Sequence, residues 1–374
     1  MSNTKSRIFL SPPFVGAAER AAVARAFDSG YVAPCGPQVD EFERMLAKLA
    51  GRKYAVAVSS GTAAIDLLMA ELGVDETWTV FAPTLTFIAT VGPAFHRGAK
   101  LVFVDSDATG NIDVSLLEKA LGSLRAKKAL VVGVDLYGNC CDYGAIAKLC
   151  RKFGAVFVTD AAEAVGAMRE GRPAGSAGLA GVYSFNGNKI ITTSGGGAIV
   201  TDDRGLAERA RKRAQQSREK CVWYEHKEVG YNYRLSNILA ALGLAQLGRL
   251  PAILRKREVN FKWYAKNWKG DLLAPTPGAN HWLTVALLAS RRERDRLLRR
   301  FAAADIEARP VWKPLHLQPV FAKCRVFGGE VAEALFERGV CLPSGTGLKS
   351  GDFARIAACL KYREGVENPL SEED

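Results

Sequence analysis

Hydrophobic and polar positions form two different periodic patterns along this chain, and the first pattern is that of a helix. Val39, Phe42, Leu46 and Leu49 recur at the spacing of one face of an α-helix. From residue 54 onward, short apolar runs bounded by Gly, Pro, Asp or Asn alternate with segments long enough for helices. The runs lie at residues 54–58, 79–81, 101–104, 130–134 and 155–158. Continuously apolar strands that alternate with helices are typical of a mainly parallel sheet covered on both faces.

The alternation of apolar strands and helices ends near residue 250, where a long basic, helix-like stretch begins. A further series of predicted strands and helices follows at residues 282–288, 293–304, 307–312 and 350–360. We therefore predict an α/β fold with two domains. The large domain, residues 1–250, contains an N-terminal helical segment and the mainly parallel central sheet between helices. The small domain, residues 251–374, is a second α/β unit.

The composition adds few constraints. The 374 residues are 48% hydrophobic and 24% charged, which is ordinary for a soluble globular protein. No apolar run approaches the length of a membrane span, and no signal-peptide core follows the first residues, so we expect a cytoplasmic protein without membrane insertion. The eight cysteines show no Cys-x-x-Cys spacing and the acidic residues no clear ligand spacing. We expect no metal site.

The net charge of +12 fits nucleic acid, an anionic membrane surface or a phosphorylated small substrate as a partner. The basic clusters at residues 211–213 and 291–300 lie in predicted helices, where solvated helix faces are the simpler interpretation. No nucleic-acid-binding motif accompanies them, so we expect no nucleic-acid partner.

Candidate chemistry lies where the predicted strands end, because open parallel sheets bind ligands at the carboxyl ends of their strands. Ser60, Gly61, Thr62 and Ala63 follow the first run and begin a helix. The free N–H groups and the positive end of a helix suit a phosphate. An ordinary helix N-cap would explain the same residues.

Three further residues follow strand ends. Asp160 would either cap the next helix or pair with a protonated ring nitrogen or a metal. Lys189 lies among Ser, Asn and Gly, where a partly desolvated amine can act as a nucleophile toward an aldehyde. Phe87 would either stack on a cofactor ring or pack in the core. A phosphate cradle, a carboxylate and a lysine amine are together the anchors that pyridoxal 5′-phosphate (PLP) needs.

These residues lie in motifs that resemble those of the DegT/DnrJ/EryC1/StrS family of sugar aminotransferases. The matching motifs are residues 60–64, 160–164, 184–189 and 230–236. The resemblance covers nearly the whole chain and implies the fold of type I PLP enzymes. Other stretches are similar to the branch of the family that aminates C4 of a UDP-linked sugar in the UDP-N,N′-diacetylbacillosamine pathway. They are residues 9–13, 188–197, 224–226, 309–313 and 341–346.

The resemblance implies roles for individual residues. Lys189 would carry PLP as a Schiff base and shuttle the proton, and Asp160 would keep the pyridine nitrogen protonated. The other implied cofactor contacts are Ser60, Gly61, Thr62, Ala63, Phe87, Glu163, Ser184, Asn186 and Asn232. Glu163 stands where many relatives carry Gln or His. Asn232 matches a residue that reaches the phosphate from the neighbouring subunit, so the resemblance also implies a homodimer with shared active sites.

The resemblance further implies the reaction. A branch of the family with His in place of Lys189 dehydrates sugars, so the lysine favours transamination. L-Glutamate would convert PLP to pyridoxamine 5′-phosphate, which would aminate a UDP-linked 4-keto-6-deoxysugar. Candidate substrate contacts are Asn188, Arg234, Arg309 and His316, and structural salt bridges or hydrogen bonds explain the last three equally well.

Alternative functions remain open at this point. They are a dTDP- or GDP-linked ketosugar aminotransferase and a PLP-binding regulatory protein without turnover. A dinucleotide-dependent oxidoreductase is disfavoured, because no Gly-x-Gly-x-x-Gly follows the first strand.

Overall fold

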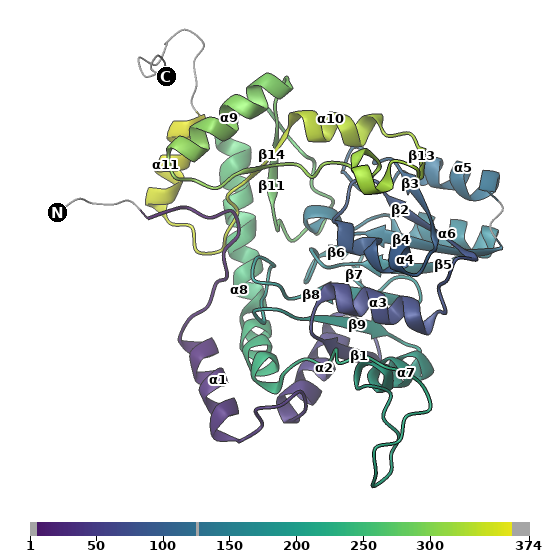
Figure 1. The fold of residues 1–374 in the computed structure, drawn as a ribbon. Helices are drawn as coiled ribbons and strands as arrows, with labels where there is room; N and C mark the ends of the chain where they lie inside the picture. The colour runs from purple at the N-terminus through teal and green to yellow at the C-terminus, as the bar shows by residue number, and fades with distance from the viewer. Residues whose placement is uncertain (1–5, 125–126, 361–374) are drawn as a thin grey trace.

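The computed structural model describes residues 6–124 and 127–360, and its centre is a sheet of eight strands (Figure 1). In spatial order these are β1 (Tyr54–Val58), β9 (Gly197–Thr201), β8 (Ala180–Ser184), β5 (Val156–Asp160), β4 (Lys128–Val134), β2 (Trp78–Pro83), β3 (Lys100–Val104) and β13 (Arg325–Phe327). Every neighbouring pair is parallel except those of β9, which runs antiparallel to β1 and β8. The predicted α/β fold with a mainly parallel sheet is confirmed.

Helices cover both faces of this sheet, because its strands are apolar on both sides. On β1, Ala55 and Ala57 belong to one buried apolar cluster, whereas Val56 and Val58 belong to another on the opposite face. The first face packs against α2 (Pro37–Leu49), α5 (Val114–Leu124), α6 (Tyr143–Phe153) and α8 (Asn237–Asn267). The second packs against α3 (Gly61–Glu71), α4 (Gly92–His96) and α7 (Arg204–Ala214).

A smaller antiparallel sheet lies in the C-terminal part of the chain. Its strands, in spatial order, are β10 (Asp271–Leu272), β11 (Thr284–Leu287), β14 (Gly339–Leu342) and β12 (Arg309–Pro310). The helices α9 (Arg291–Ala303), α10 (Glu330–Arg338) and α11 (Ser350–Leu360) follow these strands or lie between them. Phe301, Leu342 and Ile356 centre a third buried cluster, to which Ile8 from the N-terminal segment also belongs.

The remaining elements are short, apart from the first helix. They are α1 (Ala17–Asp28), the ribbon β6 (Met168–Arg169) and β7 (Arg172–Pro173), and the 3-10 turns η1 (Ile88–Thr90), η2 (Leu136–Gly138), η3 (Leu315–Leu317) and η4 (Pro319–Phe321). The predicted helical face around Phe42 is confirmed, since Val39, Phe42 and Leu46 are buried. In Figure 1, α1 and α2 lie beside the lower half of α8.

The division predicted at residue 250 falls inside α8, which continues through Pro251 as one helix of 31 residues. In addition, β13 comes from the C-terminal part but pairs with β3 of the large sheet. We propose that the large and small domains share α8, and that β13 joins the second to the first.

The helix α8 is also long and apolar enough, by length and composition, to cross a membrane, although no such segment was expected from the sequence. Its most apolar 18 residues have a mean hydropathy of 1.4, and 44% of that window is buried. Leu247, Leu250 and Ile253 face the main core. A core helix of a globular protein passes the same test for this reason.

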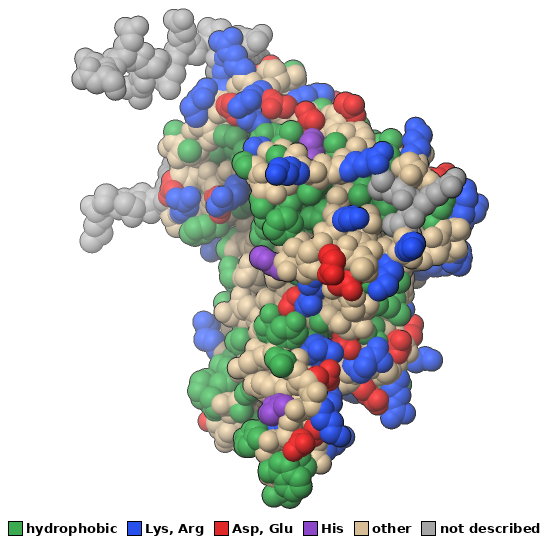
Figure 2. All heavy atoms as spheres, turned by 45° about the vertical axis from the view of Figure 1, so that its right-hand side comes forward, with side chains coloured by type: hydrophobic (Ala, Val, Ile, Leu, Met, Phe, Trp, Pro, Cys, Tyr) green, Lys and Arg blue, Asp and Glu red, His purple; other side chains and the backbone are tan. Residues whose placement is uncertain are grey.

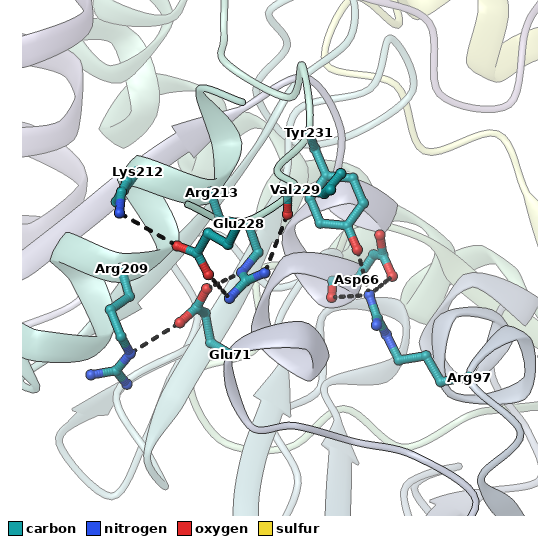
Figure 3. A network of polar contacts seen from close by, with 9 residues as sticks. All are labelled: Asp66, Glu71, Arg97, Arg209, Lys212, Arg213, Glu228, Val229 and Tyr231. Carbon is teal, nitrogen blue, oxygen red and sulfur yellow. Dashed lines mark hydrogen bonds and ion pairs between the residues drawn. The ribbon is translucent and has the colours of Figure 1, made fainter. Parts of the chain in front are cut away.

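The basic side chains of α7, which were expected to form a solvated helix face, are partly or fully exposed and are paired with acidic residues. Arg209 and Arg213 both pair with Glu71 at the end of α3, and Arg213 and Lys212 also pair with Glu228 (Figure 3). This basic cluster is therefore largely neutralised. Figure 2 likewise shows Lys and Arg spread among Asp and Glu over one face of the molecule.

Candidate active site

Lys189 lies in the turn that follows β8, at the carboxyl end of the main sheet. Its Nζ is 3.3 Å from Oε1 of Glu163 and 4.1 Å from the centre of the Trp282 ring. The side chain of Lys189 is 13% exposed and that of Glu163 is 5% exposed. The amine is therefore held between a carboxyl group and an aromatic face, largely out of water, as a nucleophilic lysine requires.

Asp160 ends β5, the strand next to β8, and its side chain is fixed by two donors. The hydroxyl of Thr90 donates to Oδ2 at 2.7 Å, and the N–H of Ala162 donates to Oδ1 at 3.1 Å. Burial raises the pKa of Asp160, while these two hydrogen bonds and the attraction of Lys189 lower it. An oriented, buried carboxyl group of this kind suits a protonated ring nitrogen.

Glu163 links Lys189 to the turn after β4. Its Oε2 accepts a hydrogen bond of 2.7 Å from the N–H of Tyr137, a residue in the left-handed region with φ of 53°. Burial raises the pKa of Glu163 to about 7, although Lys189 and the Tyr137 N–H favour the ionised form. The group can therefore take up or release a proton near neutral pH.

The residues predicted to cradle a phosphate lie where α3 begins. The Oγ of Ser60 accepts from the N–H of Ala63 at 3.0 Å, so the N-cap is real. The other N–H groups of the first turn have no acceptor within the helix and remain suited to an anion. Ser184, at the end of β8, lies against Gly61, where an added Cβ would come within 3.0 Å of the Ser184 Cβ. A side chain at position 61 would therefore require Ser184 to shift.

Four other predicted site residues, Phe87, Thr62, Asn186 and Asn188, have exposed side chains in the structure. Phe87 is 56% exposed, so it is not a core aromatic, and its ring centre is 5.5 Å from that of Trp312. Thr62 is exposed too. Asn186 and Asn188 follow β8 on the surface, and the Nδ2 of Asn186 donates to Oδ1 of Asn188 at 3.2 Å.

Asn232 and Arg234 lie in a segment that runs beside the end of β1. The N–H of Ser59 donates to the carbonyl oxygen of Tyr233 at 2.7 Å, which brings this segment next to the Ser60 turn. Arg234 donates to Oε1 of Gln215 at 3.1 Å, and Asn232 is exposed. Arg234 is thus tied to a neighbouring loop within its own chain.

Arg309 and His316 are engaged in structural contacts. Arg309 is exposed on β12 and donates two hydrogen bonds, of 3.0 and 2.8 Å, to Oε1 of Glu307. In His316, Nδ1 lies 2.6 Å from Oγ1 of Thr84, and Nε2 lies 3.0 Å from Oε1 of Glu333. These contacts match the structural alternative for both residues.

The aromatic wall of the site was not predicted from the sequence. The rings of Phe87, Trp312, Tyr137 and Trp282 follow one another with centre separations of 5.5, 5.5 and 6.2 Å, and Trp282 ends the series beside Lys189. Thr90, which holds Asp160, was also missed. The two tryptophans lie within the apolar runs 282–288 and 307–312, a pattern that indicates core packing and gives no sign of a site.

Taken together, the helix N-terminus, the buried carboxyl and the lysine amine meet at the carboxyl edge of a mainly parallel sheet. This fold and these residues define an enzyme of the PLP-dependent aminotransferase class.

Comparisons with known proteins give the family. The model of the DegT/DnrJ/EryC1/StrS aminotransferase family matches residues 13–361. EpsN of Bacillus subtilis, whose name describes a pyridoxal phosphate-dependent aminotransferase, is 42% identical over 371 residues, 95% of each chain. The GDP-perosamine synthase of Caulobacter vibrioides is 36% identical over 364 residues, 95% of this chain and 97% of the relative. The UDP-4-amino-4,6-dideoxy-N-acetyl-beta-L-altrosamine transaminase of Campylobacter jejuni is 36% identical over 236 residues, 63% of this chain and 62% of the relative.

Solved structures agree with these relatives. The aminotransferase TlmJ from Streptoalloteichus hindustanus matches with a TM-score of 0.88 and 31% identity, over 94% of this chain and 97% of TlmJ. Spr1654 from Streptococcus pneumoniae, in its PLP form, matches with a TM-score of 0.87 and 27% identity, over 95% of this chain and 98% of that structure. The chain belongs to the DegT/DnrJ/EryC1/StrS aminotransferase family, and it is a PLP-dependent sugar aminotransferase.

Proposed function

We propose that this enzyme transfers an amino group from L-glutamate to C4 of a UDP-linked 4-keto-6-deoxy-N-acetylhexosamine. The product would be UDP-2-acetamido-4-amino-2,4,6-trideoxyhexose, a precursor for glycans of the bacillosamine type. The observation that carries the amine transfer is the position of the Lys189 amine, 3.3 Å from Glu163 and beneath Trp282. The UDP-linked, C4-aminated product is supported by the name of the Campylobacter jejuni relative and by the motif at residues 188–197.

In this proposal each residue has a distinct task. PLP, when bound, supplies an electron sink for the carbanion next to its nitrogen. Lys189 holds the cofactor and moves the proton to and from the reacting carbon. The buried Asp160 keeps a proton on the ring nitrogen. The first turn of α3 and Ser184 bind the phosphate dianion, because free N–H groups and a hydroxyl converge there.

We also propose that the enzyme works in the cytoplasm as a homodimer, with Asn232 of each chain contributing to the site of the other. The exposed position of Asn232 supports this arrangement, since the side chain is free to reach a second molecule.

A GDP-linked ketosugar is the second candidate substrate. The GDP-perosamine synthase of Caulobacter vibrioides is similar over 95% of this chain, whereas the UDP-sugar transaminase is similar over 63%. Both relatives are 36% identical to this chain, so sequence identity does not favour UDP over GDP in the substrate.

The cofactor role of Lys189 is tested by absorbance. We expect the purified protein to be yellow with PLP and to lose the visible band when glutamate is added. Lys189→Ala should lack the band. Lys152→Ala, whose exposed amine pairs with Glu118, is the matched control and should keep it. A band in Lys189→Ala that still responds to glutamate would reject the assignment.

The substrate is tested by mass spectrometry after incubation with glutamate and UDP-, GDP- or dTDP-linked 4-ketosugars, and with a dTDP-linked 3-ketosugar. Exchange of the ketone for an amine only in the UDP-linked sugar supports the proposal. Turnover of the GDP-linked sugar alone selects the second candidate, and turnover of a 3-ketosugar alone rejects both.

A further inference from the structure

Arg257 is a charged side chain in the interior, 1% exposed, on the second half of α8. Its guanidinium donates to the hydroxyls of Ser11 and Thr346, each at 3.0 Å, and to the carbonyl oxygens of Trp282 and Ser344, at 2.9 and 2.8 Å. All of these partners are neutral oxygens, and burial lowers the pKa of Arg257 to about 9. A buried charge without an opposite charge disfavours folding, so stability alone gives no reason for this arginine.

Two of these partners hold the peptide bond that precedes Lys189. The indole N–H of Trp282 donates to the carbonyl oxygen of Asn188 at 2.7 Å. The hydroxyl of Ser11, which accepts from Arg257, donates to the same oxygen at 2.8 Å. One guanidinium therefore fixes both donors of the Asn188 carbonyl.

Arg257 is also connected to the amine itself. It binds the main-chain oxygen of Trp282, and the ring of the same tryptophan lies 4.1 Å from Nζ of Lys189. The backbone before Lys189 and the aromatic face beside its amine thus depend on the same side chain. These contacts join segments that are far apart in the sequence, since Arg257 and Ser11 are separated by 246 positions.

We propose that Arg257 is a positioning residue for Lys189, which sets the orientation of the lysine through Ser11, Trp282 and the Asn188 carbonyl. The proposal rests on Lys189 being the cofactor lysine. Arg257 lies behind the residues that face the amine and acts through them. Such fixing matters because a displacement of about 1 Å in a reacting group can slow a reaction by roughly 100-fold.

The division of the kinetic loss separates positioning from simple packing. If Arg257 orients Lys189, its removal should lower the maximal rate of the glutamate half-reaction and leave the glutamate concentration for half-maximal rate near the wild-type value. A purely structural role would lower the melting temperature and leave both kinetic values unchanged.

The test uses Arg257→Gln and Arg257→Lys in the PLP-loaded enzyme, with the rate of the half-reaction measured over a range of glutamate concentrations and the melting temperature measured for each variant. For Arg257→Gln we expect a maximal rate roughly ten- to a hundredfold lower, at a half-saturating glutamate concentration near that of the wild type. Arg257→Lys keeps the charge but loses the fork of donors, so its maximal rate should also fall. A wild-type maximal rate in Arg257→Gln would overturn the proposal.

The matched control is Arg294→Gln, which removes another buried arginine, on α9. Its guanidinium binds the carbonyl oxygen of Phe336 and the carboxylate of Asp295, away from the residues around Lys189. We expect a lower melting temperature with an unchanged maximal rate. If Arg294→Gln lowers the maximal rate as Arg257→Gln does, general destabilisation explains both and the positioning role is rejected.

Ser11→Ala covers the case in which Arg257→Gln does not fold, because it breaks one connection and leaves every charge in place. We expect a maximal rate several-fold lower, and a larger loss when Ser11→Ala is combined with Trp282→Phe. An unchanged rate in the double variant rejects the proposal. The band in Lys189→Ala is a separate outcome: its persistence rejects the cofactor role of Lys189, whatever the Arg257 variants show.

Discussion

Glu163 is the carboxyl group that we expect to make the stability of the apoenzyme depend on pH near neutrality. It is buried beside Lys189, with Oε2 bound to the N–H of Tyr137 at 2.7 Å. Burial raises its pKa from 4.5 to about 7, which outweighs the attraction of Lys189. The substitution Glu163→Gln keeps the shape and an oxygen for Tyr137 but removes the ionisation.

The sign of the effect follows from the raised pKa. A carboxyl group whose pKa is higher in the folded than in the unfolded protein favours folding fully below the unfolded value of 4.5. This stabilisation is lost as the pH rises to about 7. At about 1.4 kcal/mol for each pKa unit, the rise corresponds to roughly 3 kcal/mol. From pH 4.5 to 8, the wild-type free energy of unfolding should therefore fall by up to that amount relative to Glu163→Gln.

The assay is urea unfolding of both apoproteins at pH 5 and pH 8. Asp135 and Asp160 are also buried acids with raised pKa values, and both proteins contain them. The contribution of Asp135 cancels in the comparison, whereas that of Asp160 cancels in part, because the charge of Asp160 raises the pKa of Glu163. Glu118→Gln, which changes an exposed carboxyl group, is the control and should leave the profile close to that of the wild type. Parallel pH profiles for wild type and Glu163→Gln would refute the reasoning.

Three other substitutions have expected outcomes. Gly61→Ala places a Cβ 3.0 Å from that of Ser184, so we expect PLP affinity to fall, and cofactor titration with an unchanged dissociation constant would contradict the cradle. Thr90→Val removes the hydroxyl that donates to Asp160, which should lower the free energy of unfolding at pH 8 by about 1–3 kcal/mol. Thr90→Ser keeps the hydroxyl and should retain most of the wild-type free energy of unfolding. Asp105→Ala removes a buried carboxylate that accepts from three N–H groups at the start of α10, and thermal unfolding should show a loss of about 2 kcal/mol or more.

The sheet was predictable because a strand covered on both faces is apolar at every position. Five such runs were visible, and all five are strands, from Tyr54–Val58 to Val156–Asp160. Strand direction was not visible: β9 is just as buried as its neighbours but antiparallel to them. An all-apolar run reads the same in either direction, so only pairing in three dimensions settles it.

The same distinction applies to the site. Ser60, Asp160 and Lys189 were predictable because each follows a strand, and the carboxyl ends of parallel strands share one edge. The environment of the Lys189 amine was not predictable from the sequence. Trp282 comes from a run that indicates core packing, and it contacts Asn188, which lies 94 positions away in the chain.

Arg257 shows why residues that position the lysine are not predicted from the sequence. In the chain it is one of several basic residues of a long helix, and a solvated face is the simplest interpretation of such a pattern. Its burial depends on Ser11, Trp282 and Ser344, three segments that meet only after the small sheet has packed against α8. The residues that perform the chemistry can therefore be recognised in the sequence, because each follows a strand. The contacts of the residues that orient them form only in the folded C-terminal part of the chain. A substitution in the small sheet that displaces Trp282 should accordingly slow the glutamate half-reaction, even though it leaves Lys189, Asp160 and the phosphate cradle intact.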